Sequence, residues 1–107
     1  MPSGRASLDM LLLAALRRAG APLHGYGLIE ALREGSGGVF NFPEGTIYPA
    51  LHQMERDRLI QSDWGASGSR RRRLYRLTPA GEAALTQRAD AWTTYASAVG
   101  AVLRGAS

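Results

Sequence analysis

The sequence contains no cysteine, no lysine and no long apolar segment. Without cysteine the chain forms neither disulfides nor thiolate metal sites, and a reducing compartment is compatible with it. No apolar run approaches the roughly 18 residues that a membrane-spanning helix requires. The first residues, Met1 to Arg5, lack the apolar segment of a signal peptide. We therefore expect a soluble cytoplasmic protein, and its 107 residues suffice for one small domain with one core.

All 13 basic side chains are arginines, and they exceed the 9 carboxylates to give a formal net charge of +4. A basic excess favours a polyanionic partner such as nucleic acid. Arginine also suits phosphate because its planar guanidinium donates hydrogen bonds in pairs. The absence of lysine has a second explanation in genome base composition, so the sign of the charge is the more useful observation.

Catalysis and metal binding require residue clusters that this sequence does not contain. His24 and His52 lack a second histidine or a carboxylate at metal-binding spacing, apart from Glu55 three residues after His52. No nucleophile motif such as G-x-S-x-G is present. The Gly-Tyr-Gly run that follows His24 lacks the strand and the lysine of a phosphate-binding loop. We therefore expect no enzyme activity, no metal and no cofactor.

Residues 42–58 form the segment that organises the expected fold, with a helix that starts at Thr46. Helical spacing places Ile47, Leu51 and Met54 on one apolar side. The opposite side carries the hydrogen-bonding side chains of Thr46, Tyr48, His52, Gln53 and Arg56. Thr46 is the expected N-cap, and Pro49 is tolerated in the first turn, where backbone N–H groups lack helical partners. This is either a recognition helix or a solvated surface helix, and its polar side alone does not decide.

Two further helices are expected before this segment. Ser7 caps the first, which carries a broad apolar stripe and ends near Ala19. A loop over 21–25 leads to the second, expected over Tyr26 to about Glu34. Two short helices joined by a turn, the second exposing polar side chains, are typical of a helix-turn-helix. The long linker between them favours a winged-helix variant.

A β-hairpin is expected next, with strands over 59–64 and 70–77 and turn residues over 65–69. Its second strand begins with the consecutive arginines Arg70, Arg71, Arg72 and Arg73. These side chains must face solvent or a polyanion because an unpaired buried charge is costly. They form either a solubilising charge run or a wing that meets DNA phosphates or the minor groove. Trp64 is expected to pack under the hairpin.

The last helix is expected to begin at Thr78-Pro79, an N-cap followed by proline at the first helical position, and to reach about Leu103. Its apolar positions alternate at spacings of four and three, as in a coiled coil. They are Leu85, Ala89, Trp92, Ala96, Val99 and Leu103. Either a second copy of the chain covers this stripe or the helix folds back on its own domain. We expect a homodimer, with a DNA-binding domain over 1–78 and a dimerisation helix and tail over 79–107.

Trp92 is surrounded along its helix by the small residues Ala89, Ala96 and Gly100. Small neighbours either let the indole pack tightly or leave space beside it. A flat aromatic ligand could stack in such a space between the two copies of Trp92. Packing and ligand binding both remain open for this residue.

Several short runs, taken together and in order, resemble the PadR family of bacterial transcriptional regulators. They are His24-Gly-Tyr-Gly-Leu28, Gly45-Thr-Ile-Tyr-Pro-Ala-Leu51, Leu59-Ile60, Trp64, the arginines before Leu74-Tyr75, and Leu77-Thr-Pro-Ala-Gly81. The resemblance covers roughly Leu8 to Leu85 and extends to the spacing between the runs. The two longest runs in combination are far more specific than any single one.

The resemblance implies a mainly α fold with a small β-hairpin wing (α+β), that is, a winged helix-turn-helix with a C-terminal dimerisation helix. It also implies repression at a two-fold symmetric operator by a homodimer. Leu8 and Leu12 of the first helix would assist the last helix in the dimer interface. Tyr48 would contact the DNA backbone, with Thr46 and Pro49 beside it. The DNA-binding face would also include His52, Gln53, Arg56 and the four wing arginines.

A single C-terminal helix resembles the short subgroup of the family, some members of which sense hydrophobic drugs or phenolic compounds at the dimer interface. Trp92 lies where some of those members carry a ligand-stacking aromatic residue, with Ala89 and Ala96 beside it. The rival hypothesis is a winged-helix module that binds a protein partner through its basic wing. Little affinity for duplex DNA at low salt would distinguish that module from a DNA-binding repressor.

Overall fold

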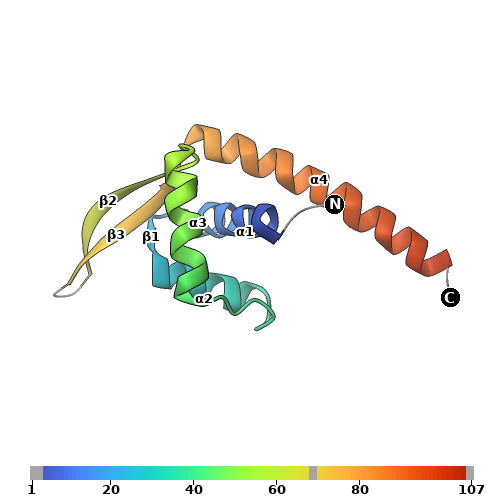
Figure 1. Cartoon of the computed structure of the whole chain (residues 1–107), viewed down its shortest axis with the longest axis horizontal. Helices are drawn as coiled ribbons and strands as arrows, with labels where there is room; N and C mark the ends of the chain where they lie inside the picture. Colours follow the sequence, from blue (N-terminus) through green and yellow to red (C-terminus); the bar gives the residue numbers. More distant parts are fainter. Residues whose placement is uncertain (1–3, 68–69, 106–107) are drawn as a thin grey trace.

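The computed structural model describes residues 4–67 and 70–105, with side chains from 7 to 65 and from 71 to 105. Its elements in chain order are α1 (Gly4–Ala19), β1 (Leu23–His24), α2 (Gly25–Gly35), α3 (Glu44–Arg56), β2 (Ile60–Ser67), β3 (Arg70–Leu77) and α4 (Pro79–Gly105) (Figure 1). The fold is mainly helical with a small antiparallel sheet, as predicted. It is a winged helix-turn-helix carrying a long C-terminal helix.

The core is built around α1, which contacts α2, α3, α4 and β3. Its buried side chains are Leu8, Leu12, Leu13 and Leu16. Leu8 and Leu12 are 6% and 0% exposed in the single chain, which corrects the expectation that they are available to a second copy. The reason is that α1 lies in the middle of the body, where neighbouring elements already cover this stripe. The helix also begins before Ser7, so Ser7 is not its cap.

The structure defines the N-caps of both helices of the helix-turn-helix, and the cap of α3 differs from the predicted Thr46. His24 caps α2, its Nδ1 accepting a hydrogen bond from the Gly27 N–H at 3.0 Å. Helix α3 begins at Glu44, two residues before Thr46, and its N-cap Pro43 makes no side-chain hydrogen bond. The N–H of Thr46 donates to the Pro43 carbonyl at 3.0 Å, so Thr46 lies inside the first turn. The Glu44 carboxylate suits this end of the helix because it opposes the positive end of the helix dipole.

The sheet has the strand order β1-β3-β2, with both pairs antiparallel. The wing strands pair from Ile60 opposite Leu77 to Ser67 opposite Arg70, so β2 continues beyond the expected end at Trp64. Strand β1 pairs Leu23 with Tyr75 and His24 with Leu74. Its two residues lie where a loop was expected, because so short a strand has no detectable periodicity. This strand anchors the start of α2 to the wing.

Helix α4 is fixed to the body by its first turn. Thr78 caps it as predicted, its Oγ1 accepting from the Gly81 N–H at 3.0 Å and donating to the Arg58 carbonyl at 2.7 Å. Gly81 is buried so closely that a Cβ there would collide with the Leu59 carbonyl oxygen. Leu85, expected at the dimer interface, is instead 1% exposed in the core of the single chain. The reason is that the first turns of α4 pack on α1, so the unpaired part of the stripe begins after Leu85.

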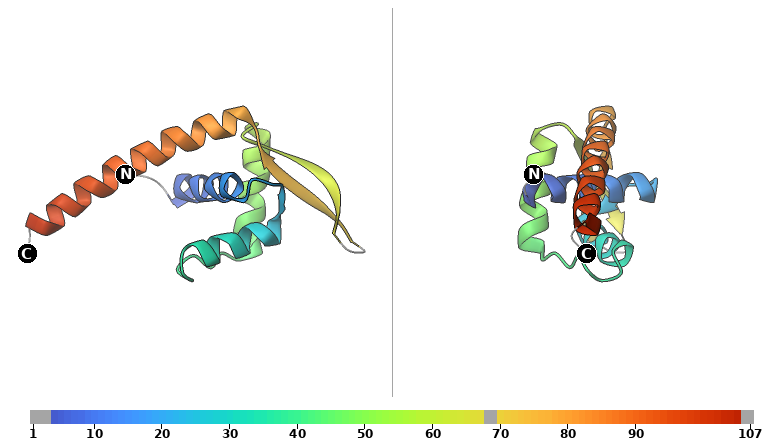
Figure 2. Two further views of the ribbon diagram at one scale, coloured as in Figure 1. Left: turned by 180° about the vertical axis from the view of Figure 1, so that it is seen from behind. Right: turned by 90° about the vertical axis from the view of Figure 1, so that its right-hand side faces the viewer.

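Beyond these turns α4 leaves the body, and the molecule measures 56 × 28 × 23 Å along its principal axes. The wing and the free end of α4 project from opposite sides (Figures 1 and 2). Along the part of the chain that the structure describes, α4 included, no helix is both long and apolar enough to cross a membrane.

Candidate nucleic-acid interface

The two sides of α3 differ as the sequence predicted. Ile47, Leu51 and Met54 are fully buried against the core. On the opposite side, Thr46, Pro49, His52 and Arg56 are exposed, while Tyr48 and Gln53 are half-buried. The burial of one side orients the other toward solvent, so the polar side chains reach the surface as a group.

Side chains on the exposed face of α3 are held by contacts within the domain. Arg56 donates to Gln53 Oε1 at 2.7 Å, and Gln53 Nε2 donates to Asp57 at 3.0 Å. The Tyr48 ring lies so close to the start of α2 that a Cβ on Gly25 would overlap it. Glycine at position 25 therefore creates the space in which Tyr48 lies.

The wing carries a cluster formed by Trp64, Arg71 and Arg73. Trp64 on β2 pairs with Arg73 on β3, and Arg71 lies two residues away on the same face of the sheet. The guanidinium carbons of Arg71 and Arg73 lie over the indole at 5.2 and 5.0 Å from the ring centroid. Trp64 is 58% exposed, so the expectation that it packs under the hairpin is wrong. The alternation of β2 and its pairing with β3 place the indole on the same face as the two arginines, the face that carries Ser62 and Tyr75 nearer the core.

Arg72 points to the other face of β3, toward the start of α2. Its Nη1 lies 3.3 Å from Nε2 of His24, and both side chains are half-buried. The sequence placed Arg72 in a basic wing but did not connect it with His24, 48 residues earlier. The feature of the sequence that could have drawn attention to His24 is its position directly before Gly-Tyr-Gly, where its side chain can cap a helix.

These elements enclose a cleft of about 590 Å³ between the start of α2, the first half of α3 and the wing. Its lining includes Tyr48 and His52 from α3, His24 before α2, Trp64 from β2, and Arg71, Arg72 and Arg73 from β3. Glu44 is the single carboxylate among the lining residues, so positive charge predominates. The side chain of Arg70 lies outside the described residues. The structure thus brings Tyr48, His52 and three wing arginines together around one basic cleft.

One hydrogen bond and one buried side chain position the wing relative to α3. Ser62 on β2 donates to Glu55 Oε2 at 2.5 Å. Tyr75 on β3 is 1% exposed in the core beside them. Burial raises the pKa of the Tyr75 hydroxyl above its usual value of 10.0, and the negative charge of Glu55 raises the pKa further. Tyr75 is therefore neutral under ordinary conditions and acts as a packing residue.

The stripe along α4 is uncovered in the single chain. Trp92 is 45% exposed, Val99 40% and Leu103 64%, and Val102 beside them is also exposed. Ala89 is half-buried and Ala96 exposed. The rings of Trp92 and Tyr95 meet edge to face with centroids 5.9 Å apart. The helix thus carries an exposed apolar surface in the part that extends beyond the body.

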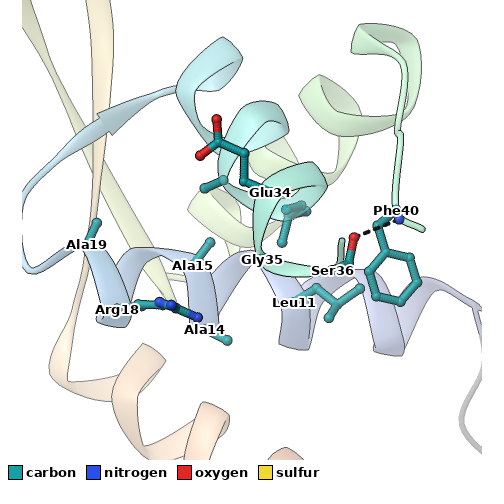
Figure 3. Close-up of a pocket in the computed structure, with 11 residues that line it drawn as sticks. Leu11, Ala14, Ala15, Arg18, Ala19, Glu34, Gly35, Ser36 and Phe40 are labelled. Atoms are coloured by element: carbon teal, nitrogen blue, oxygen red, sulfur yellow. Dashed lines mark hydrogen bonds between the residues drawn. The ribbon is translucent and has the colours of Figure 1, made fainter. Parts of the chain in front are cut away.

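A second hollow, of about 570 Å³, lies between α1 and α2 (Figure 3). Its lining includes the apolar side chains of Leu11, Ala15 and Leu32 and the charged side chains of Arg18 and Glu34. Phe40 lies at one end, its N–H donating to Ser36 Oγ at 2.8 Å. Trp92, Ala89 and Ala96 do not line this hollow, so it is separate from the predicted ligand site.

Known proteins match this chain in both sequence and fold. Transcriptional regulator Rv3488 of Mycobacterium tuberculosis is 44% identical over 66 residues, which are 61% of this chain and 58% of that protein. The chain therefore spans less than two thirds of that relative. A PadR family transcriptional regulator from Eggerthella lenta has a TM-score of 0.78 at 31% identity, over 92% of this chain and 83% of that one.

Bacillus subtilis PadR, whose structure was solved in complex with operator DNA, shares the fold with a TM-score of 0.67. The identity is 24%, over 76% of this chain and 46% of that one. The model of the transcriptional regulator PadR-like family matches residues 12–87, which include α2, α3 and the wing. This match confirms the resemblance seen in the short runs, and the long α4 is consistent with the short subgroup. The chain belongs to the PadR-like family of transcriptional regulators.

Proposed function

We propose that this chain is a homodimeric DNA-binding repressor that binds a two-fold symmetric operator with α3 and the wing. The basic cleft carries the proposal. Three arginines, Arg71, Arg72 and Arg73, extend along one wall of a cleft whose other wall is the exposed face of α3. Guanidinium groups neutralise DNA phosphates, and an α-helix fits the major groove. The PadR structure with operator DNA, similar in fold, supports this assignment.

In this proposal the contacts divide between DNA backbone and bases. Tyr48, at the start of α3, meets the backbone, with Thr46 and Pro49 beside it. His52, Gln53 and Arg56, further along the exposed face, reach toward base edges in the major groove. Gln53 must then exchange its hydrogen bonds with Arg56 and Asp57 for bonds to a base. The wing arginines, Arg70 included, contact phosphates flanking the groove.

The proposed dimerisation rests on the stripe of α4, which the described part of the single chain leaves exposed. A second copy would bury Trp92, Val99 and Leu103, and removing these side chains from water is the driving force for association. Two α3 helices that enter successive major grooves lie roughly 34 Å apart. The pair of chains carries a charge of +8, twice the +4 of one chain, which favours approach to DNA.

We also propose that a small hydrophobic or aromatic compound at this interface releases the repressor. Trp92 offers a flat ring, and Ala89 and Ala96 leave space one helical turn to either side of it. A compound that prefers one spacing of the two α3 helices shifts the dimer away from the DNA-competent arrangement. The compound would therefore quench Trp92 fluorescence and lower operator affinity. A Trp64→Phe background isolates the Trp92 signal, and quenching that survives Trp92→Phe would place the compound elsewhere.

The direct test is a binding titration with labelled duplexes. One duplex carries the region upstream of the chain's own gene, and the control has the same length and a random sequence. We expect tighter binding to the upstream duplex, by about 10³-fold or more at physiological salt. We also expect a steep loss of affinity for both duplexes as salt rises. Negligible affinity for either duplex even at low salt would contradict the proposal and favour a protein partner for the basic cleft.

A further inference from the structure

His24 makes two contacts through the two nitrogens of its ring. Nδ1 accepts a hydrogen bond from the Gly27 N–H at 3.0 Å, which caps α2. Nε2 lies 3.3 Å from Nη1 of Arg72. The first contact involves a backbone donor whose position is fixed by the helix. The second involves the end of a long, flexible side chain.

A neutral imidazole has one nitrogen that accepts and one that carries a proton. Because Nδ1 accepts from Gly27, the neutral form of His24 carries its proton on Nε2. Nε2–H then faces the Arg72 guanidinium, which has only donors. In this contact His24 and Arg72 therefore present hydrogen-bond donors to each other, and neither side chain offers an acceptor to the other.

We propose that His24 and Arg72 together form a seat for one phosphate oxygen. An oxygen accepting from both Nε2–H and Nη1–H satisfies two donors that otherwise face each other, and its negative charge is stabilised by the guanidinium. The seat lies in the wall of the basic cleft, where Glu44 is the single carboxylate of the lining. The structural role of His24 as the α2 cap fixes the tautomer that this second role requires.

The geometry distinguishes Arg72 from its neighbours on the wing. Arg71 and Arg73 lie over Trp64 on one face of the sheet, whereas Arg72 lies on the opposite face and contacts His24. The pairing of His24 with Leu74 in the sheet holds the histidine at this point of the wing. A phosphate bound there would touch the start of α2 and the wing at once.

The phosphate has two possible sources, the DNA backbone or free inorganic phosphate. If the oxygen belongs to the DNA backbone, the inference rests on the proposed function, because the seat is then one backbone contact of the operator complex. Two variants separate the roles of the residues. His24→Asn retains a side-chain acceptor favoured at an N-cap but removes Nε2–H. Arg72→Gln removes the charge, and Arg71→Gln is the matched control from the opposite face of the same strand.

In duplex titrations with the full-length chain, we expect His24→Asn to lower affinity roughly tenfold, as for loss of one hydrogen bond to a charged group. Its salt slope should equal that of the natural chain because no charge is lost. Arg72→Gln should lower affinity and also reduce the salt slope by about one phosphate per chain. The double variant should lose less than the product of the two single losses because both residues bind the same oxygen. Arg71→Gln combined with His24→Asn should show the full product.

Two further measurements keep the outcomes distinct. Nitrogen NMR of the His24 ring should show a proton on Nε2, and a proton on Nδ1 would overturn the proposal. Inorganic phosphate added without DNA should shift the Nε2 signal in the natural chain but not in Arg72→Gln. If duplex affinity ignores His24→Asn while phosphate still shifts the ring, the seat serves the free anion. If neither the duplex affinity nor the Nε2 signal changes, the seat does not exist, even if the natural chain binds DNA. Failure of the natural chain to bind any duplex instead refutes the proposed function.

Discussion

Ser62 on the wing donates a hydrogen bond to the carboxylate of Glu55 on α3 across 2.5 Å. This bond connects the two parts of the molecule that face DNA in the proposed complex. Because Glu55 is half-buried, loss of the hydroxyl leaves its charge poorly solvated. We expect Ser62→Ala to lower the free energy of unfolding by about 1–3 kcal/mol, measured by urea denaturation. Gln61→Ala, on the exposed face of the same strand, is the control. Equal effects of the two changes would contradict this role of Ser62.

Variants of the Trp64 cluster separate the contribution of the arginine charges to DNA binding from the contribution of their orientation. Arg71→Ala should weaken binding similarly on all duplexes and reduce the salt slope by about 0.9 per chain. Trp64→Leu should keep the slope, because both guanidinium groups remain, but lower affinity about 2- to 5-fold through loss of the ring contacts. Salt titrations on one random duplex measure both quantities. If Trp64→Leu binds as the natural chain does, the indole does not orient Arg71 and Arg73.

Gly81 is a position where the structure requires the absence of a side chain. Gly81→Ala would drive a Cβ into the Leu59 carbonyl oxygen, and backbone cannot yield as a flexible side chain does. We expect a loss of about 1–3 kcal/mol in unfolding free energy, seen in thermal denaturation. Gly35→Ala at the end of α2 meets open space and should be neutral or stabilising. Equal stability of the two variants would refute the packing of α4 on the Leu59 turn.

The exposed stripe of α4 predicts the oligomeric state. Val99→Glu places a charge in the proposed interface without touching the core of the single chain, so it should yield a folded monomer with greatly reduced operator affinity. Sedimentation equilibrium and circular dichroism check the two statements. Ala101→Glu, on a different side of the helix, should remain dimeric. A natural chain that is monomeric at micromolar concentrations would contradict the interface.

Tyr75 predicts a pH dependence at the alkaline end. Its pKa is raised in the folded chain by burial and by Glu55, so the unfolded chain loses the hydroxyl proton first as pH rises. The unfolded state then binds fewer protons, and stability falls with pH above about 10, the ordinary tyrosine pKa. Denaturation curves at increasing pH should show this fall in the natural chain and a smaller fall in Tyr75→Phe. A parallel decline in both would assign the effect to other groups.

Periodicity alone predicted the parts of the molecule that depend on local pattern. The buried side of α3 and the Thr78 cap follow directly from residue spacing and cap chemistry. Three features did not, because tertiary contacts determine them. Strand β1 exists only by pairing with β3, and Trp64 is exposed because the twist and pairing of the hairpin place it with arginines. Spacing alone cannot tell whether Leu8, Leu12 and Leu85 belong to a dimer interface or to the core. The central position of α1 in the folded chain places them in the core.

The attachment of α4 has a mechanical consequence. Thr78 and Gly81 bind its first turn to Arg58 and Leu59, the turn that connects α3 to the wing. The helix has 27 residues and is therefore about 40 Å long. A helix of this length is a stiff lever attached to the body that carries α3 and the wing. A tilt of a few degrees at the far end consequently swings α3 and the wing as one unit, since Ser62 and Glu55 keep them together.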